Sequence, residues 1–401
     1  MLDLPHSFLL LPPLSSNHFA KTLRKVHLSA VRFLLTAPRS QVDDGLQQKS
    51  RALQTILTRI LKQDPARLLR SIARQDVLTP LRILQLGIGD PNQMFVNMVT
   101  NILVDLQFLP EDFLWDVKID TLIDVEQRRI LRFEPSILGF AIGPAGIVVR
   151  LHCGTHVSWK DIESHSIVEQ PFVELPAKCF LSTFDSNPLA NQEDHPDKDG
   201  NRIDLGGKPQ ADWHSSLTQS FALIEETIPE WWSEFSLFMN RIVPVGFHAE
   251  QHLSASYAEA LGLAYVSLHP DPLIMAEAIV HESQHSKLNA LIWLDPVLTN
   301  GHSEWTSSPV RPDLRPLIGV MLAAHAFVPV SAMHARMKAA RHPLCQQPSF
   351  QRRSRDVLSS NARALETLRQ KSRPTPLGKR ILTGLMELDS AARSYLTAGS
   401  R

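Results

Sequence analysis

The sequence predicts an α+β protein that is predominantly helical. Apolar residues recur at helical spacing in long segments near both ends, whereas the stretch from about 116 to 182 has short apolar runs separated by glycine and proline. With 401 residues, the chain can form two or three subdomains. We expect a helical N-terminal region at 1–115, a β-rich region with a long polar loop at 116–213, a helical region at 214–345 and C-terminal helices at 346–401.

The first two regions show both kinds of pattern. Leu53, Leu57 and Leu61 repeat every four residues within a helical pattern that extends from about 17 to 75, and a second helix is expected from Met94 to Leu109. The segment ILGFAIGPAGIVVRLHC has two apolar runs around a Gly-Pro-Ala-Gly sequence, which predicts a β-hairpin. The segment 183–213 is rich in Asp, Asn, Pro and Gly and predicts a long loop.

Part of that loop, DHPDKDGNRID, is similar to a calcium-binding loop. When Gly200 is aligned with the invariant glycine of such loops, His195 and Gly206 occupy positions that require acidic residues. We therefore expect no calcium there.

The helical region should begin with a helix at about 214–242, followed by a strand at 262–268. A further helix is expected from Pro272 to about Leu294, where Pro296 stops it, and an apolar helix from Leu317 to Met337. A proline-containing segment at 372–376 separates two charged amphipathic C-terminal helices.

Composition excludes several classes of protein. Lysine plus arginine and aspartate plus glutamate number 41 each, so no overall charge attracts nucleic acid or a membrane surface. The three cysteines form no CxxC pair, which indicates neither a disulfide framework nor a thiolate metal site and favours a reducing cytoplasm. The N-terminus lacks the basic segment of a signal peptide, and no apolar stretch approaches the roughly 20 residues that span a bilayer. We expect a soluble, cytoplasmic protein.

The segment HESQH, residues 281–285, is the strongest candidate site. On a helix, His281 and His285 project from the same face one turn apart and can bind one metal ion. Histidines at this spacing can also be a solvated pair or hydrogen-bonded core residues. The flanking residues are strongly apolar, which favours a sheltered metal site in an enzyme.

The third metal ligand separates two enzyme classes. Glu304 follows His285 at a spacing like that of zinc peptidases, in which Glu282 would be the general base that activates a zinc-bound water. However, Glu304 lies in a polar segment with three prolines close behind, which argues against the packed helix that such a ligand requires.

The other candidate ligand is His325, in the very apolar segment LIGVMLAAHAFVPV. It would complete a three-histidine metal face with open positions. Arg311 and Arg315 precede that segment and could hold a dicarboxylate such as 2-oxoglutarate, because arginine binds carboxylates in a bidentate manner. The alternative is a pair of surface arginines.

The longer flanks resemble a known family. The segments PDPLIMAEAIVHESQHSKLNALIWL, SSPVRPDLRPLIGVMLAAHAFVPV and HPDKDGNRIDLGG are similar to the HExxH-motif peptide-modification proteins of ribosomal natural-product clusters, and the resemblance is strongest over about 180–340. One departure is Val310, where the family often has tryptophan.

The resemblance implies an iron(II)- and 2-oxoglutarate-dependent β-hydroxylase that uses dioxygen to modify a precursor peptide. It implies metal ligation by His281, His285 and His325, and 2-oxoglutarate binding by Arg311 and Arg315. Glu282 would then orient a ligand histidine or a water. The loop 183–213 and the segment FHAEQHLSASYAE (247–259) are candidates for lining a peptide groove. A zinc peptidase and a non-catalytic peptide-binding scaffold remain alternatives.

Overall fold

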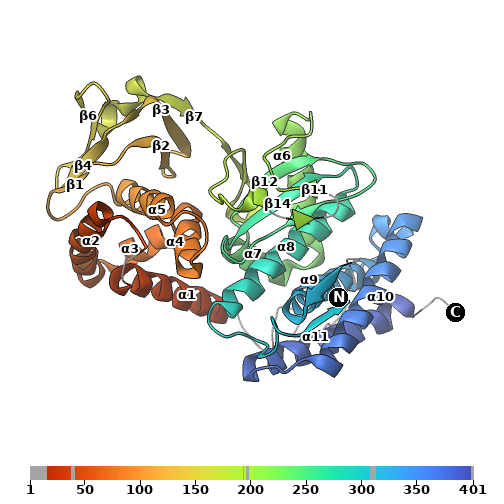
Figure 1. Cartoon of the computed structure of the whole chain (residues 1–401). Helices are drawn as coiled ribbons and strands as arrows, with labels where there is room; N and C mark the ends of the chain where they lie inside the picture. The colour runs from red at the N-terminus through yellow and green to blue at the C-terminus, as the bar shows by residue number, and fades with distance from the viewer. Residues whose placement is uncertain (1–15, 38–40, 193, 196–197, 308–312, 399–401) are drawn as a thin grey trace. The chain divides into compact units, whose positions relative to one another are not determined.

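The computed structural model describes residues 16–37, 41–192, 194–195, 198–307 and 313–398 (Figure 1). They form an α+β protein that is predominantly helical, as predicted. The chain divides into two compact units. The first unit comprises Met1–Arg24, Glu174–Leu181 and Ile203–Arg401, and the second comprises Lys25–Val173 and Ser182–Arg202. The predicted regions 214–345 and 346–401 therefore lie together in the first unit.

Helices form the N-terminal part of the second unit, as the apolar spacing predicts. Leu53, Ile56, Leu57 and Ile60 are all buried. One helix, α4, was not predicted, because Pro80 lies inside it and interrupts the helical pattern. The helices are α1 (Ser16–Thr36), which begins in the first unit, α2 (Asp44–Gln63), α3 (Pro65–Ile72), α4 (Gln75–Leu86) and α5 (Pro91–Leu106).

Two small antiparallel sheets complete the second unit. The predicted hairpin is confirmed: β4 and β5 pair from Gly139↔Arg150 to Gly143↔Gly146, and Gly146 turns the chain with a positive φ of 105°. One sheet has the order β1-β4-β5-β6 and the other the order β2-β3-β7. The strands are β1 (Phe113–Trp115), β2 (Ile119–Asp124), β3 (Arg129–Ile137), β4 (Gly139–Gly143), β5 (Gly146–Arg150), β6 (His156–Ser158) and β7 (Ile167–Glu169), and a 3₁₀ helix η2 (Trp159–His165) precedes β7.

The long polar segment 183–213 has little regular structure over its described residues, in agreement with the prediction of a loop. It contains a 3₁₀ turn, η4 (Ala190–Gln192), and a two-residue pairing of β10 (Asp194–His195) with β11 (Lys198–Asp199). The next helix starts a few residues earlier than expected, at Gln210.

The principal sheet of the first unit has the order β13-β14-β12-β9-β8. Its strands are β8 (Phe172–Leu175), β9 (Cys179–Ser182), β12 (Arg241–Phe247), β13 (Ser254–Ala255) and β14 (Leu263–Leu268), with η3 (Pro176–Lys178) between the first two. The predicted strand 262–268 corresponds to β14, which is buried at every position and pairs in parallel with β12. Such burial is typical of a parallel strand covered on both faces.

The expected helix at 214–242 is shorter and interrupted. It comprises α6 (Gln210–Thr227), a 3₁₀ turn η5 (Pro229–Trp231) and α7 (Trp232–Phe238). The break occurs at Pro229, which has no N–H to donate and favours an extended residue before it. Residues 241 and 242 belong to β12, so the helical prediction was wrong there.

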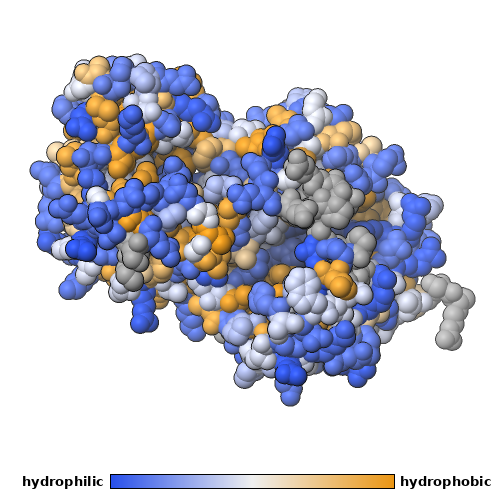
Figure 2. Space-filling model, in the orientation of Figure 1, coloured by the Kyte–Doolittle hydropathy of each residue, from blue (hydrophilic) through white to orange (hydrophobic). Residues whose placement is uncertain are grey.

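The remaining helices of the first unit match the predicted ones. They are α8 (Pro272–Ile292), α9 (Leu317–Ala339), α10 (Pro348–Lys371) and α11 (Pro376–Thr397), with η6 (Pro343–Gln346) before α10 and a short hairpin of β15 (Trp305–Ser307) and β16 (Leu314–Pro316) before α9. The apolar helix α9 packs against α8, α10 and α11. Figure 2 shows a mostly hydrophilic outer surface over α10 and α11, as expected for amphipathic helices.

Among the described residues, α9 is the single helix long and apolar enough to cross a membrane, so the expectation that no apolar stretch approaches that length was wrong for this segment. Its most apolar window is 83% buried within the fold, as in the core helix of a soluble protein.

Candidate metal centre

The helix that carries HESQH starts with a strong local signal. The Asp271 side chain accepts a hydrogen bond from the backbone N–H of Leu273, and Pro272 occupies the first helical turn. Since β14 ends at Leu268, the chain passes directly from a buried strand into this capped helix. The helix is buried along most of its length, so its backbone and the HESQH residues on it are held in place by packing as well as by the cap.

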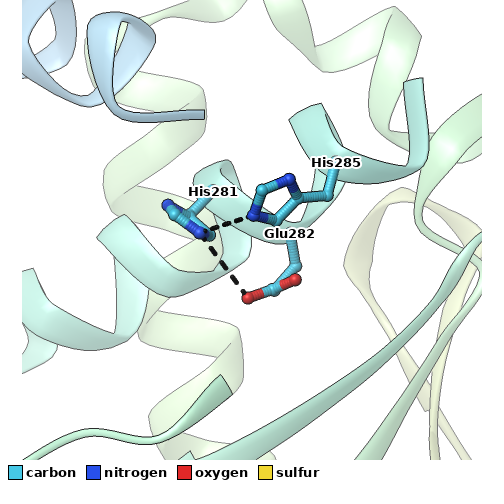
Figure 3. A group of neighbouring side chains, drawn as sticks. All are labelled: His281, Glu282 and His285. Atoms are coloured by element: carbon cyan, nitrogen blue, oxygen red, sulfur yellow. Dashed lines mark hydrogen bonds and ion pairs between the residues drawn. The ribbon is translucent and has the colours of Figure 1, made fainter. Parts of the chain in front are cut away.

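Three side chains of α8 converge on one point, as Figure 3 shows for His281, Glu282 and His285. The Nε2 atoms of His281 and His285 are 2.8 Å apart, and Oε1 of Glu282 lies 4.0 Å from Nε2 of His281. Two imidazole nitrogens that bind one ion at about 2.0–2.1 Å are separated by roughly 2.9–3.4 Å for angles of about 90–110°. The observed pair comes within a few tenths of an ångström of that spacing, so the histidines fit a divalent metal ion.

The environment keeps both imidazoles neutral. Burial lowers the pKa of His281 well below its ordinary value, and the neighbouring His285 lowers it further. Burial also lowers the pKa of His285, against the opposing effect of Glu282. The side chain of His281 remains 16% exposed. Neutral imidazole is the form that binds metals, and the partial exposure leaves a path for a ligand.

Glu282 faces the metal-binding side of His281. Its side chain is 1% exposed, and its Oε2 atom has no hydrogen-bond partner among the described residues. An acid that orients a ligand histidine normally binds the ring nitrogen that does not bind the metal. That atom, Nδ1 of His281, has no such partner within the described part of the chain. The geometry therefore favours Glu282 as a group that contacts a water or substrate at the ion.

His325 lies on α9, which packs against α8, and is 1% exposed. Burial lowers its pKa well below the ordinary value; the charges of Lys287 and His285 lower it further, while a backbone hydrogen bond at Gln284 opposes the shift. Its Nδ1 atom has no hydrogen-bond partner among the described residues. The group of convergent ligand atoms includes His281, Glu282 and His285 and leaves His325 outside. Ligation by His325 stays a prediction.

The other predicted residues have different positions. Glu304 lies between a turn that ends at Ser303 and the start of β15, not on a helix, and is not part of the convergent group. Arg315 lies on β16, where its Nε atom is 3.0 Å from Oδ2 of Asp313. Arg311 lies outside the described residues. The role of both arginines in 2-oxoglutarate binding stays a prediction.

Residues that sequence analysis did not identify surround His281. The ring of Phe327, on α9, packs edge-on against the His281 ring with 4.4 Å between centroids. Arg353, on α10, has its guanidinium carbon 6.0 Å from the centroid of the same Phe327 ring. Glu277, one turn before His281 on α8, binds Arg353 and His334. No local motif signals this cluster, because its members come from three helices.

A separate hollow of about 640 Å³ lies in the second unit between α5, the start of β2 and residues 184–188. The candidate metal ligands belong to the first unit and do not line it. Its lining is partly polar and includes the carboxylates of Asp76, Asp90, Asp120 and Asp185.

Comparisons with known proteins give no information on the function of the site. No family model matches the chain, and no curated protein is significantly similar to it.

Proposed function

We propose that the protein is a metal-dependent enzyme, an iron(II)- and 2-oxoglutarate-dependent β-hydroxylase acting on a residue of a ribosomally made precursor peptide. The observation that carries the proposal is the convergence of the His281 and His285 nitrogens, 2.8 Å apart, on a buried helix. His281 and His285 would hold the iron with His325 as third ligand, and Arg311 and Arg315 would bind 2-oxoglutarate. The three cysteines are free, which supports a reducing, cytoplasmic location.

The bound iron would supply the activation of dioxygen, whereas the protein positions the reactants and excludes water. Phe327 packs against His281 and limits the directions from which the ligand ring can be approached. Glu282, buried beside the convergent nitrogens, would hold a water or a polar substrate group there. The irregular 183–213 loop and the 247–259 segment would contact the peptide.

A zinc peptidase is the second candidate, and the position of Glu282 favours it. Its Oε1 atom is 4.0 Å from the His281 Nε2 atom, on the side where a metal-bound water would lie, so it could act as a general base. The third ligand of this alternative, Glu304, is not on a helix, which supports the oxygenase instead. A non-catalytic peptide-binding scaffold is the third possibility.

One incubation discriminates the three. The protein, iron(II), 2-oxoglutarate and a candidate peptide are mixed without oxygen and then exposed to it, and the products are analysed by mass. A gain of one oxygen atom, about 16 Da, with formation of succinate supports the hydroxylase. Peptide cleavage, tested in parallel with zinc, supports the peptidase. Unchanged peptide with either metal contradicts both enzymatic functions.

The metal site is tested separately by calorimetric titration of the apo-protein with zinc(II). Removal of an outer ligand partner costs roughly 10–100-fold in affinity, so loss of a ligand should cost at least about 100-fold. We expect this loss in His281→Ala and His285→Ala. The matched control is His302→Ala, which removes an exposed histidine of the same unit. Equal affinity in all three variants would eliminate the proposed centre.

A further inference from the structure

Arg353 is an anchored arginine beside the candidate metal centre. Its Nε atom donates a 2.6 Å hydrogen bond to Oε2 of Glu277. The Glu277 side chain is 3% exposed, whereas the Arg353 side chain is 40% exposed. A buried carboxylate thus holds one edge of a guanidinium whose other edge can reach solvent.

The anchor is itself held firmly. Nε2 of His334 lies 2.8 Å from Oε1 of Glu277, and Oγ of Ser354 lies 3.1 Å from Nδ1 of the same histidine. Burial raises the pKa of Glu277, but His334 and Arg353 outweigh that effect, so the net pKa is lowered and the carboxylate stays charged. Fixed partners on both oxygens restrict how Arg353 can move.

The terminal nitrogens of Arg353 are available. Within the described part of the chain, the guanidinium makes no hydrogen bond or ion pair other than the one from Nε to Glu277. Arginine donors in a planar fork suit a carboxylate, which they bind in a bidentate manner. Because Glu277 already holds the Arg353 guanidinium, the side chain loses little conformational entropy on binding and is preorganised for such a ligand.

The distance to the metal centre is short. Glu277 precedes His281 by four residues on α8, a rise of about 6 Å along the helix. The ring of Phe327, on α9, contacts both ends of this distance, because it packs against the His281 ring and lies under the Arg353 guanidinium. A ligand that reaches from the convergent histidine nitrogens to Arg353 therefore crosses about one helical turn over an aromatic ring.

We propose that Arg353 binds one carboxylate of a small dicarboxylate whose other end lies at the His281–His285 centre. This inference rests on the proposed function and deepens it, because it adds a residue of α10 to Arg311 and Arg315 as a group that binds the distal carboxylate of the co-substrate. The Phe327 ring packs against the carbon chain between the two ends. Glu277 is a positioning residue that aims the fork.

The test measures binding, not turnover. The full chain, with and without zinc(II), is titrated calorimetrically with 2-oxoglutarate, with glutarate, which lacks the oxo group, and with pyruvate, which lacks the distal carboxylate. Arg353→Gln keeps a donor for Glu277 but removes the charged fork, and Arg353→Lys keeps the charge without the fork. Arg352→Gln is the matched control, since Arg352 is an exposed neighbour on the same helix.

We expect Arg353→Gln to weaken 2-oxoglutarate and glutarate roughly 10- to 100-fold, because hydrogen bonds to charged groups contribute on this scale. Arg353→Lys should give a smaller loss, pyruvate binding should not change, and Arg352→Gln should behave as the wild type. Circular dichroism and zinc affinity should be unchanged in Arg353→Gln, which separates lost binding from lost folding.

The outcomes separate the subsite from the proposed function. Zinc-dependent 2-oxoglutarate binding that is equal in wild type and Arg353→Gln overturns the subsite while sparing the function. Glutarate and 2-oxoglutarate binding that depends on Arg353 but not on zinc supports the contact with Arg353, but it contradicts the placement of the other end at the metal centre and, with it, the proposed function. Absence of binding of either dicarboxylate to the wild type overturns the subsite.

Discussion

The buried pair of Lys287 and Glu234 offers a sharp test of how the metal-carrying helix is held. Lys287 lies on α8, two residues after His285, and its side chain is fully buried. Its Nζ atom is 2.5 Å from Oε2 of Glu234 on α7. Burial raises the pKa of Glu234 and lowers the pKa of Lys287, so each charge depends on the other for stabilisation.

We predict that Lys287→Met lowers the free energy of unfolding by about 3–5 kcal/mol, because it leaves a buried carboxylate without its cation. Methionine keeps much of the apolar stem but loses the ammonium, whose nitrogen lies 4.4 Å, 5.9 Å and 5.7 Å from the ring centroids of Phe19, Trp231 and Phe238. The double variant Lys287→Met with Glu234→Met removes both charges and should be less destabilised than either single variant, since apolar replacement of a buried pair is often neutral.

The assay is urea unfolding followed by circular dichroism, with the slope compared among variants to check that the same surface is exposed. Lys379→Met, at an exposed position of α11, is the control and should change stability by less than about 0.5 kcal/mol. A Lys287→Met variant as stable as the control would refute the reasoning. So would a double variant whose loss equals the sum of the two single losses, because that means the charges do not interact.

Three further predictions concern the second unit, the helix cap and the acid of the motif. Burial lowers the pKa of His27 from 6.5 to about 4, so the folded protein favours the neutral imidazole and becomes less stable as the pH falls from 6.5 towards 4. Between pH 7 and pH 5 the free energy of unfolding should decrease by at most about 2 kcal/mol. Urea unfolding of His27→Gln should show a correspondingly smaller decrease than the wild type. Asp271→Ala removes the cap of α8 and should cost about 1 kcal/mol in thermal unfolding, whereas the exposed Asp356→Ala should cost almost nothing. Glu282→Gln should retain coupling of 2-oxoglutarate decarboxylation to hydroxylation, measured as the ratio of succinate to hydroxylated peptide; a complete loss of hydrolysis in this variant would instead identify a peptidase.

The features that the sequence predicts correctly are those encoded locally. Asp271 and Pro272 start α8, and the four-residue spacing of His281 and His285 alone brings their rings together on that helix. The β4–β5 hairpin also follows from a short segment. In each case the interacting residues are near neighbours in the chain, so their geometry depends on one element only.

The features that escaped prediction depend on distant residues. Strand β12 contains Pro244 and follows an aromatic-rich helical pattern, and its strand character comes from parallel neighbours β9 and β14. Arg353 lies in a charged amphipathic helix and resembles a surface residue until its partner Glu277, 76 positions earlier, is known. His325 falls on the expected helix, but no local pattern determines where its ring points.

The division into units has a practical consequence for truncation. The chain passes between the units four times, since the segment Glu174–Leu181 returns to the first unit before the chain leaves it again. That segment supplies β9 to the edge of β12. A fragment that starts at Ile203 would retain HESQH but lose β8 and β9, and the uncovered edge of β12 would be open to pairing with other chains. Such a fragment should aggregate, so expression trials that aim to isolate the metal centre should keep both units in one polypeptide.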